Sequence, residues 1–204
     1  MKVGILGTGS VGQTLAQGFL DKGHDVVLGT RDPATKEGLP APAVTFADAA
    51  RHGEVLVLCV HGQAAESAVA LTGPENLAGK LVLDTTNPLE GGPDGAHRPA
   101  GVKDSLLQAV QRAAPKGRFV KAWNCVPGIE MVDPALPGGP GTQFICGDDA
   151  AAKQQATGIL KEFGWDAVDI GGASMAPYVE GMALAVINHG MRSGEWAWGL
   201  KLLR

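Results

Sequence analysis

The fold is decided by the first twelve residues, which read Met1-Lys-Val-Gly-Ile-Leu-Gly7-Thr8-Gly9-Ser10-Val11-Gly12. The apolar run Val3–Leu6 predicts a buried strand, and the segment Ser10–Asp21 predicts an amphipathic helix. The glycines between them match the pattern GxGxxG, which by itself is weak evidence because glycine-rich turns occur in many folds. A second apolar strand at Asp25–Leu28 completes the strand–turn–helix–strand context. The stretch therefore predicts a dinucleotide-binding unit, with an ordinary structural turn as the alternative.

Each glycine of the pattern has its own physical task. We expect Gly7 to allow the sharp turn out of the strand, where a Cβ atom would clash. Gly9 lets the backbone approach a pyrophosphate, and Gly12 lets the helix lie against the first strand. The unpaired N–H groups that open the helix lie at the positive end of its dipole, so they form an anion site.

The end of the second strand predicts which dinucleotide binds. An NAD site usually has Asp or Glu there to hold the ribose 2′-hydroxyl, whereas this chain has Gly29-Thr30-Arg31. The forked guanidinium of Arg31 and the hydroxyl of Thr30 suit a 2′-phosphate, so we predict NADP. Asp32 could instead bond a ribose hydroxyl, and Arg31 could merely cap a turn. Lys36 either assists the phosphate or is a solvated charge.

Composition indicates an ordinary globular protein. The 204 residues are 45% hydrophobic and 19% charged, with a net charge of −4, which fits one domain or one domain with an appendage. Lys and Arg form no stripe, so nucleic acid and anionic membranes are not expected as partners.

Cysteine usage and hydropathy predict a cytoplasmic protein. Cys59, Cys125 and Cys146 are widely spaced and form no metal pattern, so we expect reduced thiols and no metal site. Met1 leads directly into a strand, which leaves no room for a signal peptide. No apolar stretch approaches 18 residues, so no membrane span is expected.

Strands and helices alternate along the chain, which predicts an α/β fold: a Rossmann-like, doubly wound, mostly parallel sheet with a C-terminal helical extension. We expect an NADP-binding Rossmann domain at 1–132 and a smaller extension at 133–204, packed together as one unit. Further strands are predicted at 44–46, 54–60, 80–84, 119–123, 143–146 and 166–170. The first helix, at 10–21, is expected to end with Gly23 as its C-cap. Further helices are predicted at 47–52, 63–71, 104–114 with Asp104 as a candidate N-cap, after Asp148-Asp149 as capping residues to about 163, and from 174 onward.

Ligands of such sheets bind outside the carboxyl ends of the strands. This rule brings together the segments Gly7–Gly12, Thr30-Arg31, Val60-His61, Thr86-Asn87 and Asn124–Gly128. His61 could donate to a phosphate or ribose, or simply form a turn. Asn87 and Asn124 could each contact the ligand or only satisfy loop backbone groups.

Five motifs resemble one known family, and the resemblance extends over essentially the whole chain. They are Met1–Arg31, Asp84-Thr-Thr-Asn87-Pro88, Lys121-Ala-Trp-Asn124, Cys146-Gly-Asp-Asp149 and Trp198–Arg204. They resemble the NADPH-dependent F420 reductases, the 8-hydroxy-5-deazaflavin:NADP oxidoreductases, and the cytosolic flavin-using domain of a group of ferric reductases.

The resemblance implies direct hydride transfer between NADPH and a stacked F420 or flavin (FMN or FAD) ring, with no catalytic acid, base or nucleophile. It implies that Thr8–Val11, including Ser10, hold the pyrophosphate, and that Thr30 and Arg31 hold the 2′-phosphate. Val60 and His61 would flank the path to the nicotinamide, and Cys125-Val126-Pro127 would lie against it, with Val126 packing one face. His61 stands where the family often has proline, and Cys125 where threonine is common.

The acceptor side of the site is less defined by sequence. The stretch 90–101 is rich in glycine and proline and predicts a loop at the site entrance, where His97 and Arg98 could meet an anionic acceptor or be solvated. His189 is predicted to be a packing residue. Trp196 and Trp198 near the carboxyl end suggest an interface, so we expect a homodimer. Reduction of a small imine or keto compound, and a non-catalytic NADP-sensing module, remain the alternative functions.

Overall fold

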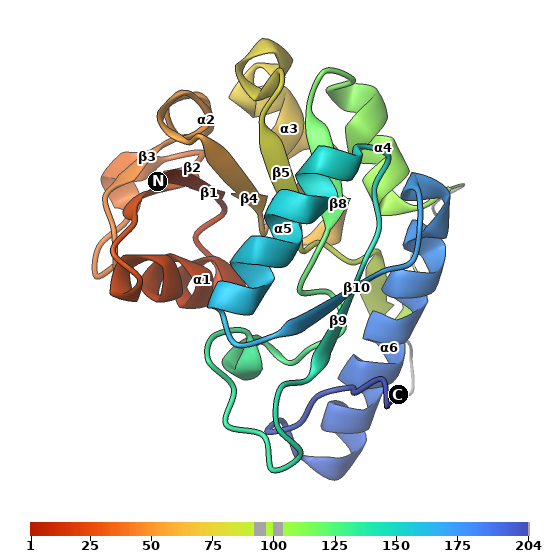
Figure 1. Cartoon of the computed structure of the whole chain (residues 1–204). Helices are drawn as coiled ribbons and strands as arrows, with labels where there is room; N and C mark the ends of the chain where they lie inside the picture. The colour runs from red at the N-terminus through yellow and green to blue at the C-terminus, as the bar shows by residue number, and fades with distance from the viewer. Residues whose placement is uncertain (92–96, 100–103, 204) are drawn as a thin grey trace.

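The main sheet has six parallel strands in the order β3-β2-β1-β4-β5-β8. The computed structural model of the protein describes residues 1–91, 97–99 and 104–203. Strand order reverses between β1 and β4, as in a doubly wound sheet, so the predicted Rossmann-like α/β fold is confirmed (Figure 1). The strands are β1 (Lys2–Leu6), β2 (Asp25–Thr30), β3 (Ala43–Thr45), β4 (Val55–Leu58), β5 (Leu81–Asp84) and β8 (Arg118–Lys121).

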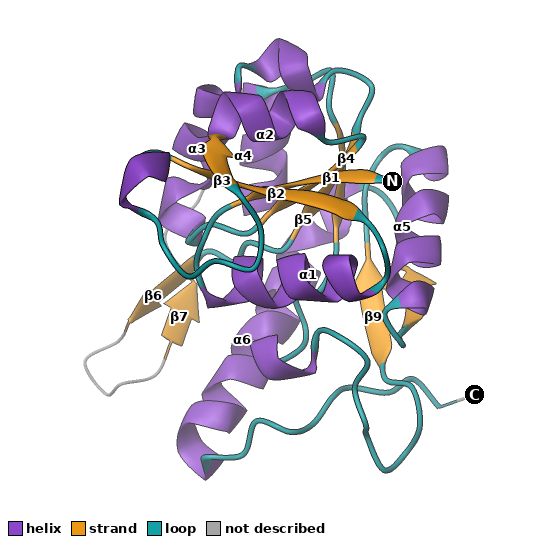
Figure 2. Ribbon diagram, turned by 90° about the vertical axis from the view of Figure 1, so that its left-hand side faces the viewer, coloured by secondary structure: helices purple, strands orange, loops and turns teal. Residues whose placement is uncertain are grey.

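Helices cover both faces of this sheet. One face packs on α2 (Phe46–His52), α3 (Ala65–Thr72) and α4 (Leu106–Ala113), and the other on α1 (Ser10–Asp21) and α5 (Ala150–Glu162) (Figure 2). Short 3-10 helices join the elements: η1 (Pro33–Thr35), η2 (Gly62–Ala64), η3 (Pro74–Leu77), η4 (Gly128–Glu130) and η5 (Ala173–Met175).

The strands read as continuous apolar runs because both faces of the sheet are buried. Side chains alternate between two core clusters: Val55 and Val57 of β4 pack with α1 and α5, whereas Leu56 and Leu58 pack with α2, α3 and α4. This alternation follows from the two-residue period of a strand.

Helix ends follow local chemistry. Gly23 has φ 77°, and the N–H groups of Gly23 and His24 donate to the carbonyls of Leu20 and Phe19, a Schellman motif that ends α1. Asp149 caps α5 as predicted, accepting from the Ala152 N–H at 2.7 Å. The prediction of Asp104 as N-cap of α4 was wrong. Ser105 caps it in a capping box with Gln108, because the helix begins one position later.

The stretch 90–101 is not wholly a loop. β6 (Leu89–Gly91) and β7 (His97–Pro99) pair antiparallel, so part of the predicted loop forms a hairpin. Residues 92–96 and 100–103, and the side chains of His97 and Arg98, lie outside the described structure, so the suggested contacts of these two residues stay untested.

The C-terminal segment contributes to the same core as the N-terminal one. β9 (Thr142–Ile145) and β10 (Asp166–Asp169) form a parallel pair, which an antiparallel bridge from Cys146 to Lys121 joins to the main sheet. Ile145, Leu160 and Trp165 share a cluster with Val3 and Leu15. The division at residue 132 stays a prediction.

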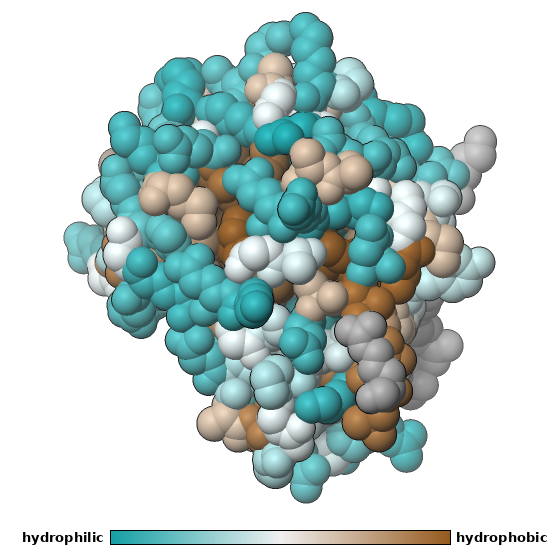
Figure 3. Space-filling model, in the orientation of Figure 1, coloured by the Kyte–Doolittle hydropathy of each residue, from teal (hydrophilic) through white to brown (hydrophobic). Residues whose placement is uncertain are grey.

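The helix α6 (Ala176–Ser193) closes the chain, and hydrophobic side chains gather over it on the face seen in Figure 3. The tail after it folds back on the chain: Trp196 lies on Gly190, and the His189 and Trp198 rings meet edge to face at 4.7 Å. His189 is exposed, and apart from this ring contact its predicted packing role stays a prediction. Both tryptophans have partners within the chain, and the homodimer stays a prediction.

A buried ion network joins four elements beneath the carboxyl edge of the sheet. The Lys121 Nζ lies 2.8 Å from Asp84 Oδ2 and 3.0 Å from Glu180 Oε1, and it donates to the Thr86 carbonyl at 2.5 Å. The side chains of Lys121 and Asp84 are 0% exposed and that of Glu180 is 5% exposed.

Glu180, at the other end of the network, also has hydrogen-bond partners. The Glu180 carboxylate accepts the N–H groups of Leu106 and Leu107, which are in the first turn of α4, so the helix dipole adds to its stabilisation. Burial by itself lowers the pKa of Lys121, but the neighbouring Asp84 and Glu180 carboxylates outweigh it and raise that pKa above its usual value. The lysine is charged at neutral pH.

Replacing Lys121 by Met should destabilise the fold strongly. The substitution leaves two buried carboxylates without their cation, which typically costs about 3–5 kcal/mol. Urea unfolding of the variant and the wild type, followed by circular dichroism, measures the difference in the free energy of unfolding.

Lys116→Met is the matched control, because Lys116 pairs with Glu75 at 3.1 Å and both side chains are well exposed. An exposed pair contributes roughly 0–1 kcal/mol. Equal losses in the two variants would contradict the assigned role of the buried network.

Candidate functional site

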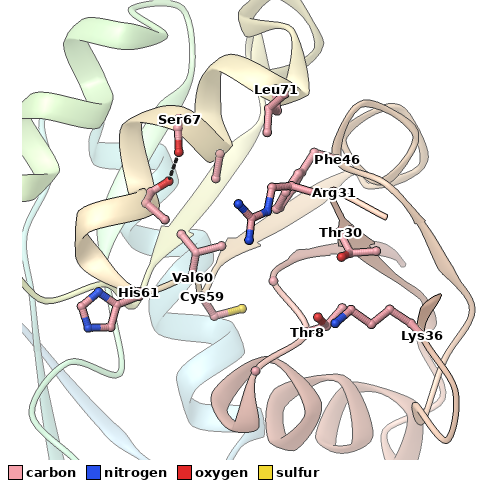
Figure 4. Close-up of a pocket in the computed structure, with 15 residues that line it drawn as sticks. Thr8, Thr30, Arg31, Lys36, Phe46, Cys59, Val60, His61, Ser67 and Leu71 are labelled. Carbon is pink, nitrogen blue, oxygen red and sulfur yellow. Dashed lines mark hydrogen bonds between the residues drawn. The ribbon is translucent and has the colours of Figure 1, made fainter. Parts of the chain in front are cut away.

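A cleft of about 290 Å³ opens at the carboxyl edge of the sheet, where the glycine turn, the end of β2 and the loop after β4 meet (Figure 4). The rule for doubly wound sheets predicts a ligand at this position. The cleft is lined by Gly7, Thr8, Gly9, Gly29, Thr30, Arg31, Lys36, Phe46, Cys59, Val60, His61, Ala64, Ser67, Ala68 and Leu71.

The glycine turn has the geometry of an anion cradle. Gly7 has φ 135°, and a Cβ on it would stand 2.7 Å from the Cys59 carbonyl oxygen. A Cβ on Gly12 would collide with the Gly7 carbonyl, whereas one on Gly9 would meet nothing within 4 Å. Gly9 is the N-cap of α1 and has no side chain to cap it, so the first N–H groups are available to an anion. The turn fits a pyrophosphate.

The polar wall of the cleft is cationic. The guanidinium of Arg31 extends into the cleft, and the Lys36 side chain reaches toward Thr8 (Figure 4). In the described part of the chain, neither cation takes part in a salt bridge. Thr30 is 7% exposed at the end of β2. Asp32 is the N-cap of η1 and is not among the lining residues. This wall fits a 2′-phosphate better than a bare ribose.

A second cleft of about 250 Å³ adjoins the first, and Cys59, Val60 and His61 line both. It brings together the predicted residues Val11, Asn87, Asn124, Val126 and Pro127. The remaining walls come from Gly62, Thr85, Thr86, Leu89, Trp123, Gly128, Met131, Ile187 and Trp196. Predicted residues from both ends of the proposed nucleotide path thus line two adjoining clefts.

Trp123 sets the direction of the chain on the floor of the second cleft. It is fully buried with φ 58°, a conformation that costs a bulky residue roughly 1–3 kcal/mol. The surroundings compensate: its Nε1 donates to the Met131 carbonyl at 3.1 Å, and its ring meets Phe163 edge to face at 5.2 Å. The turn at Trp123 leads the chain from β8 into Asn124–Pro127.

Hydrogen bonds hold the two rim loops together. The Asn124 Nδ2 donates to the Thr86 carbonyl at 2.9 Å and to Asn87 Oδ1 at 3.1 Å. The Thr86 hydroxyl donates to Asp84 Oδ1 at 2.6 Å. The loops after β5 and β8 are therefore fixed on the Lys121 network below them.

Three predicted site residues line neither cleft: Ser10, Gly12 and Cys125. Gly12 lies against the Gly7 carbonyl instead. Cys125 is 1% exposed, and its Sγ donates to the Val179 carbonyl at 3.4 Å. Burial raises the pKa of the Cys125 thiol to about 12, so the thiol stays protonated and a poor nucleophile. Ser10 is exposed in the first turn of α1 and does not line the clefts, so only its backbone N–H suits a phosphate.

Several wall residues escaped sequence reasoning. Phe46, Ser67 and Leu71 lie on α2 and α3, and Ile187 and Trp196 come from α6 and the tail. Only the folded chain brings these residues to the rim. Gly62 could have been found from the sequence, because a glycine just after the end of a strand indicates that another part of the backbone comes close. In the structure, a Cβ on Gly62 would collide with the Asn87 carbonyl.

Across residues 1–91, 97–99 and 104–203, the structure has no group of three or more His, Cys, Asp or Glu suited to a metal ion. None of the helices in these ranges is long and apolar enough to cross a bilayer. The three cysteines are free and buried.

Comparison with known proteins agrees with this geometry. Residues 2–88 match the family described as "NADP oxidoreductase coenzyme F420-dependent". The crystal structure of a candidate F420-dependent NADP reductase from Arthrobacter sp. FB24 is 34% identical with a TM-score of 0.93, covering 100% of both chains. Metalloreductase STEAP3 of Rattus norvegicus is 31% identical over 193 residues, which are 91% of this chain and 37% of that protein.

The chain thus spans little more than a third of the length of the curated relatives it matches. A reductive aminase from Aspergillus terreus, solved with NADPH and ethyl levulinate, is 22% identical with a TM-score of 0.67, over 95% of this chain and 62% of that one. At that identity the likeness shows the fold alone. The match along the full Arthrobacter chain shows more: this chain belongs to the family of F420-dependent NADP oxidoreductases and is an NADP-binding oxidoreductase.

Proposed function

We propose that the protein transfers hydride directly between NADPH and a planar redox coenzyme, F420 or a flavin such as FMN or FAD. The observation that carries this proposal is that the two clefts adjoin each other, with Cys59, Val60 and His61 in the walls of both. One cleft has phosphate-binding chemistry, and the other is walled mainly by apolar and aromatic side chains.

The first cleft would hold the nucleotide at its charged end. The N–H groups opening α1 would bind the pyrophosphate, and Arg31, Thr30 and Lys36 the 2′-phosphate. Leu71 and Phe46 lie beside Arg31 in the same cleft (Figure 4) and would enclose the adenine. The charged end then fixes where the remainder of the nucleotide lies.

The second cleft would hold the reacting ring and its acceptor. Val126 and Pro127 line one side, and Ile187 and Trp196 contribute apolar surface from α6 and the tail. Aromatic rings stack favourably on a planar ligand. NADPH, when bound, supplies the hydride. Hydride transfer between two rings needs no nucleophile, and burial keeps the nearby Cys125 thiol protonated. The protein would therefore contribute the relative position of the rings and the exclusion of water.

Arg31→Ala should weaken NADPH binding by about ten- to hundredfold, because a charge-assisted hydrogen bond to the 2′-phosphate contributes roughly 1.5–3 kcal/mol. NADH lacks this phosphate, so its affinity should change little. Titration of nucleotide fluorescence measures both dissociation constants.

Arg51→Ala serves as the control for Arg31→Ala. Arg51 is an exposed arginine of α2 that pairs with Asp48 and does not line the cleft. Its loss should leave both affinities unchanged. Equal weakening of NADPH and NADH by Arg31→Ala would rule out the phosphate role.

A screen of acceptors should identify the second substrate. NADPH absorbance should fall when F420, FMN or FAD is added to the wild-type protein, and NADH should support a slower rate. Quinones and ferric chelates extend the panel. Tight NADPH binding without turnover of any acceptor would exclude the proposed reaction and favour the NADP-sensing module instead.

A further inference from the structure

Asn124 carries a buried acceptor atom that no described residue satisfies. Asn124 is one of the residues that line the second cleft and is 3% exposed, yet its Oδ1 has no hydrogen-bond partner among the described residues. An acceptor left unpaired in the interior costs about 1–3 kcal/mol, and native structures contain few of them. A bound group with a donor would resolve this.

The orientation of the amide is fixed by its neighbours. The Thr86 carbonyl and Asn87 Oδ1 both accept from the Asn124 Nδ2. Turning the amide over would place Oδ1 against the Thr86 carbonyl, so two acceptors would face each other. The Lys121 ammonium also donates to that carbonyl, which holds it in place. Oδ1 therefore lies on the side of the amide away from the Thr86 carbonyl.

We propose that Asn124 Oδ1 accepts a hydrogen bond from the carboxamide NH₂ of the nicotinamide and so fixes which face of the ring meets the acceptor. The inference rests on the proposed function, since it assumes that the nicotinamide end of NADPH enters the second cleft. It makes Asn124 a positioning residue.

The chemistry of the atom selects this ligand group. A phosphate carries no donor at neutral pH, and the cations suited to it, Arg31 and Lys36, line the other cleft. The carboxamide is the N–H donor at the reacting end of the nucleotide. Val126 lines the same cleft from two residues further along the chain. A hydrogen bond on one edge and an apolar contact on one face are sufficient to orient a planar ring.

Asn124→Leu, which is similar in size and has no polar atom, tests the assignment. Binding of NADPH is compared with binding of its reduced 3-acetylpyridine analogue, in which a methyl group replaces the carboxamide NH₂. The wild type should bind NADPH about three- to tenfold more tightly than the analogue, and the variant should bind both alike.

The ratio of the two affinities isolates the Oδ1 contact. Asn124→Leu also removes the hydrogen bonds that Nδ2 donates to the loops. This loss should weaken the binding of NADPH and of the analogue by the same factor, so it does not change the ratio of the two affinities. Asn76→Leu is the control: this asparagine of η3 donates to the Thr72 carbonyl and lines neither cleft, and the wild-type ratio should persist. Asn124→Ser provides a second variant if Leu prevents folding.

Two outcomes would overturn the assignment: a wild type that does not discriminate between the nucleotides, or an Asn124→Leu variant that discriminates as the wild type does. Either result would assign Oδ1 to an ordered water or to the framework. Because binding is measured without any acceptor, the comparison tests the role of Asn124 even if the protein reduces no acceptor. Failure at Asn124 likewise leaves hydride transfer itself untouched.

Discussion

The charge of Lys121 is the constraint on which the site depends. A buried ammonium is stable only where carboxylates and carbonyls compensate its lost hydration, and here they come from β5, α6 and the loop after β5. Glu180 in turn takes the first N–H groups of α4. One cation thus fixes the floor of the second cleft relative to α6, the helix that contributes to its wall.

The two clefts divide the work of binding by their chemistry. In the proposed function the first would use the open N-terminus of α1 and the cations Arg31 and Lys36, which suit phosphate groups. The second has few groups that could exchange protons and a buried, protonated thiol nearby. Such an arrangement favours a reaction governed by the position of two rings over one that needs an acid or base. The family membership is consistent with this division.

Local chemistry made much of the fold predictable. The Gly7–Gly12 turn, the helix end at Gly23 and the cap at Asp149 depend on residues within one turn of each other, and all three formed as expected. The same local reasoning failed by one residue at Ser105, where two adjacent polar residues both suited the cap. It also missed the β6–β7 hairpin, because glycine and proline indicate turns but do not reveal backbone pairing.

By itself, the sequence determined the α/β order of the chain, the glycine turn and the cationic strand end at Thr30-Arg31, because each is encoded by neighbours in the chain. Only the tertiary structure decided which residues complete the site. It turned Cys125 into the core, brought Ile187 and Trp196 to the rim, and joined Asp84, Lys121 and Glu180. These contacts link residues far apart in sequence, and burial and compensation of charge exist only once the chain has folded.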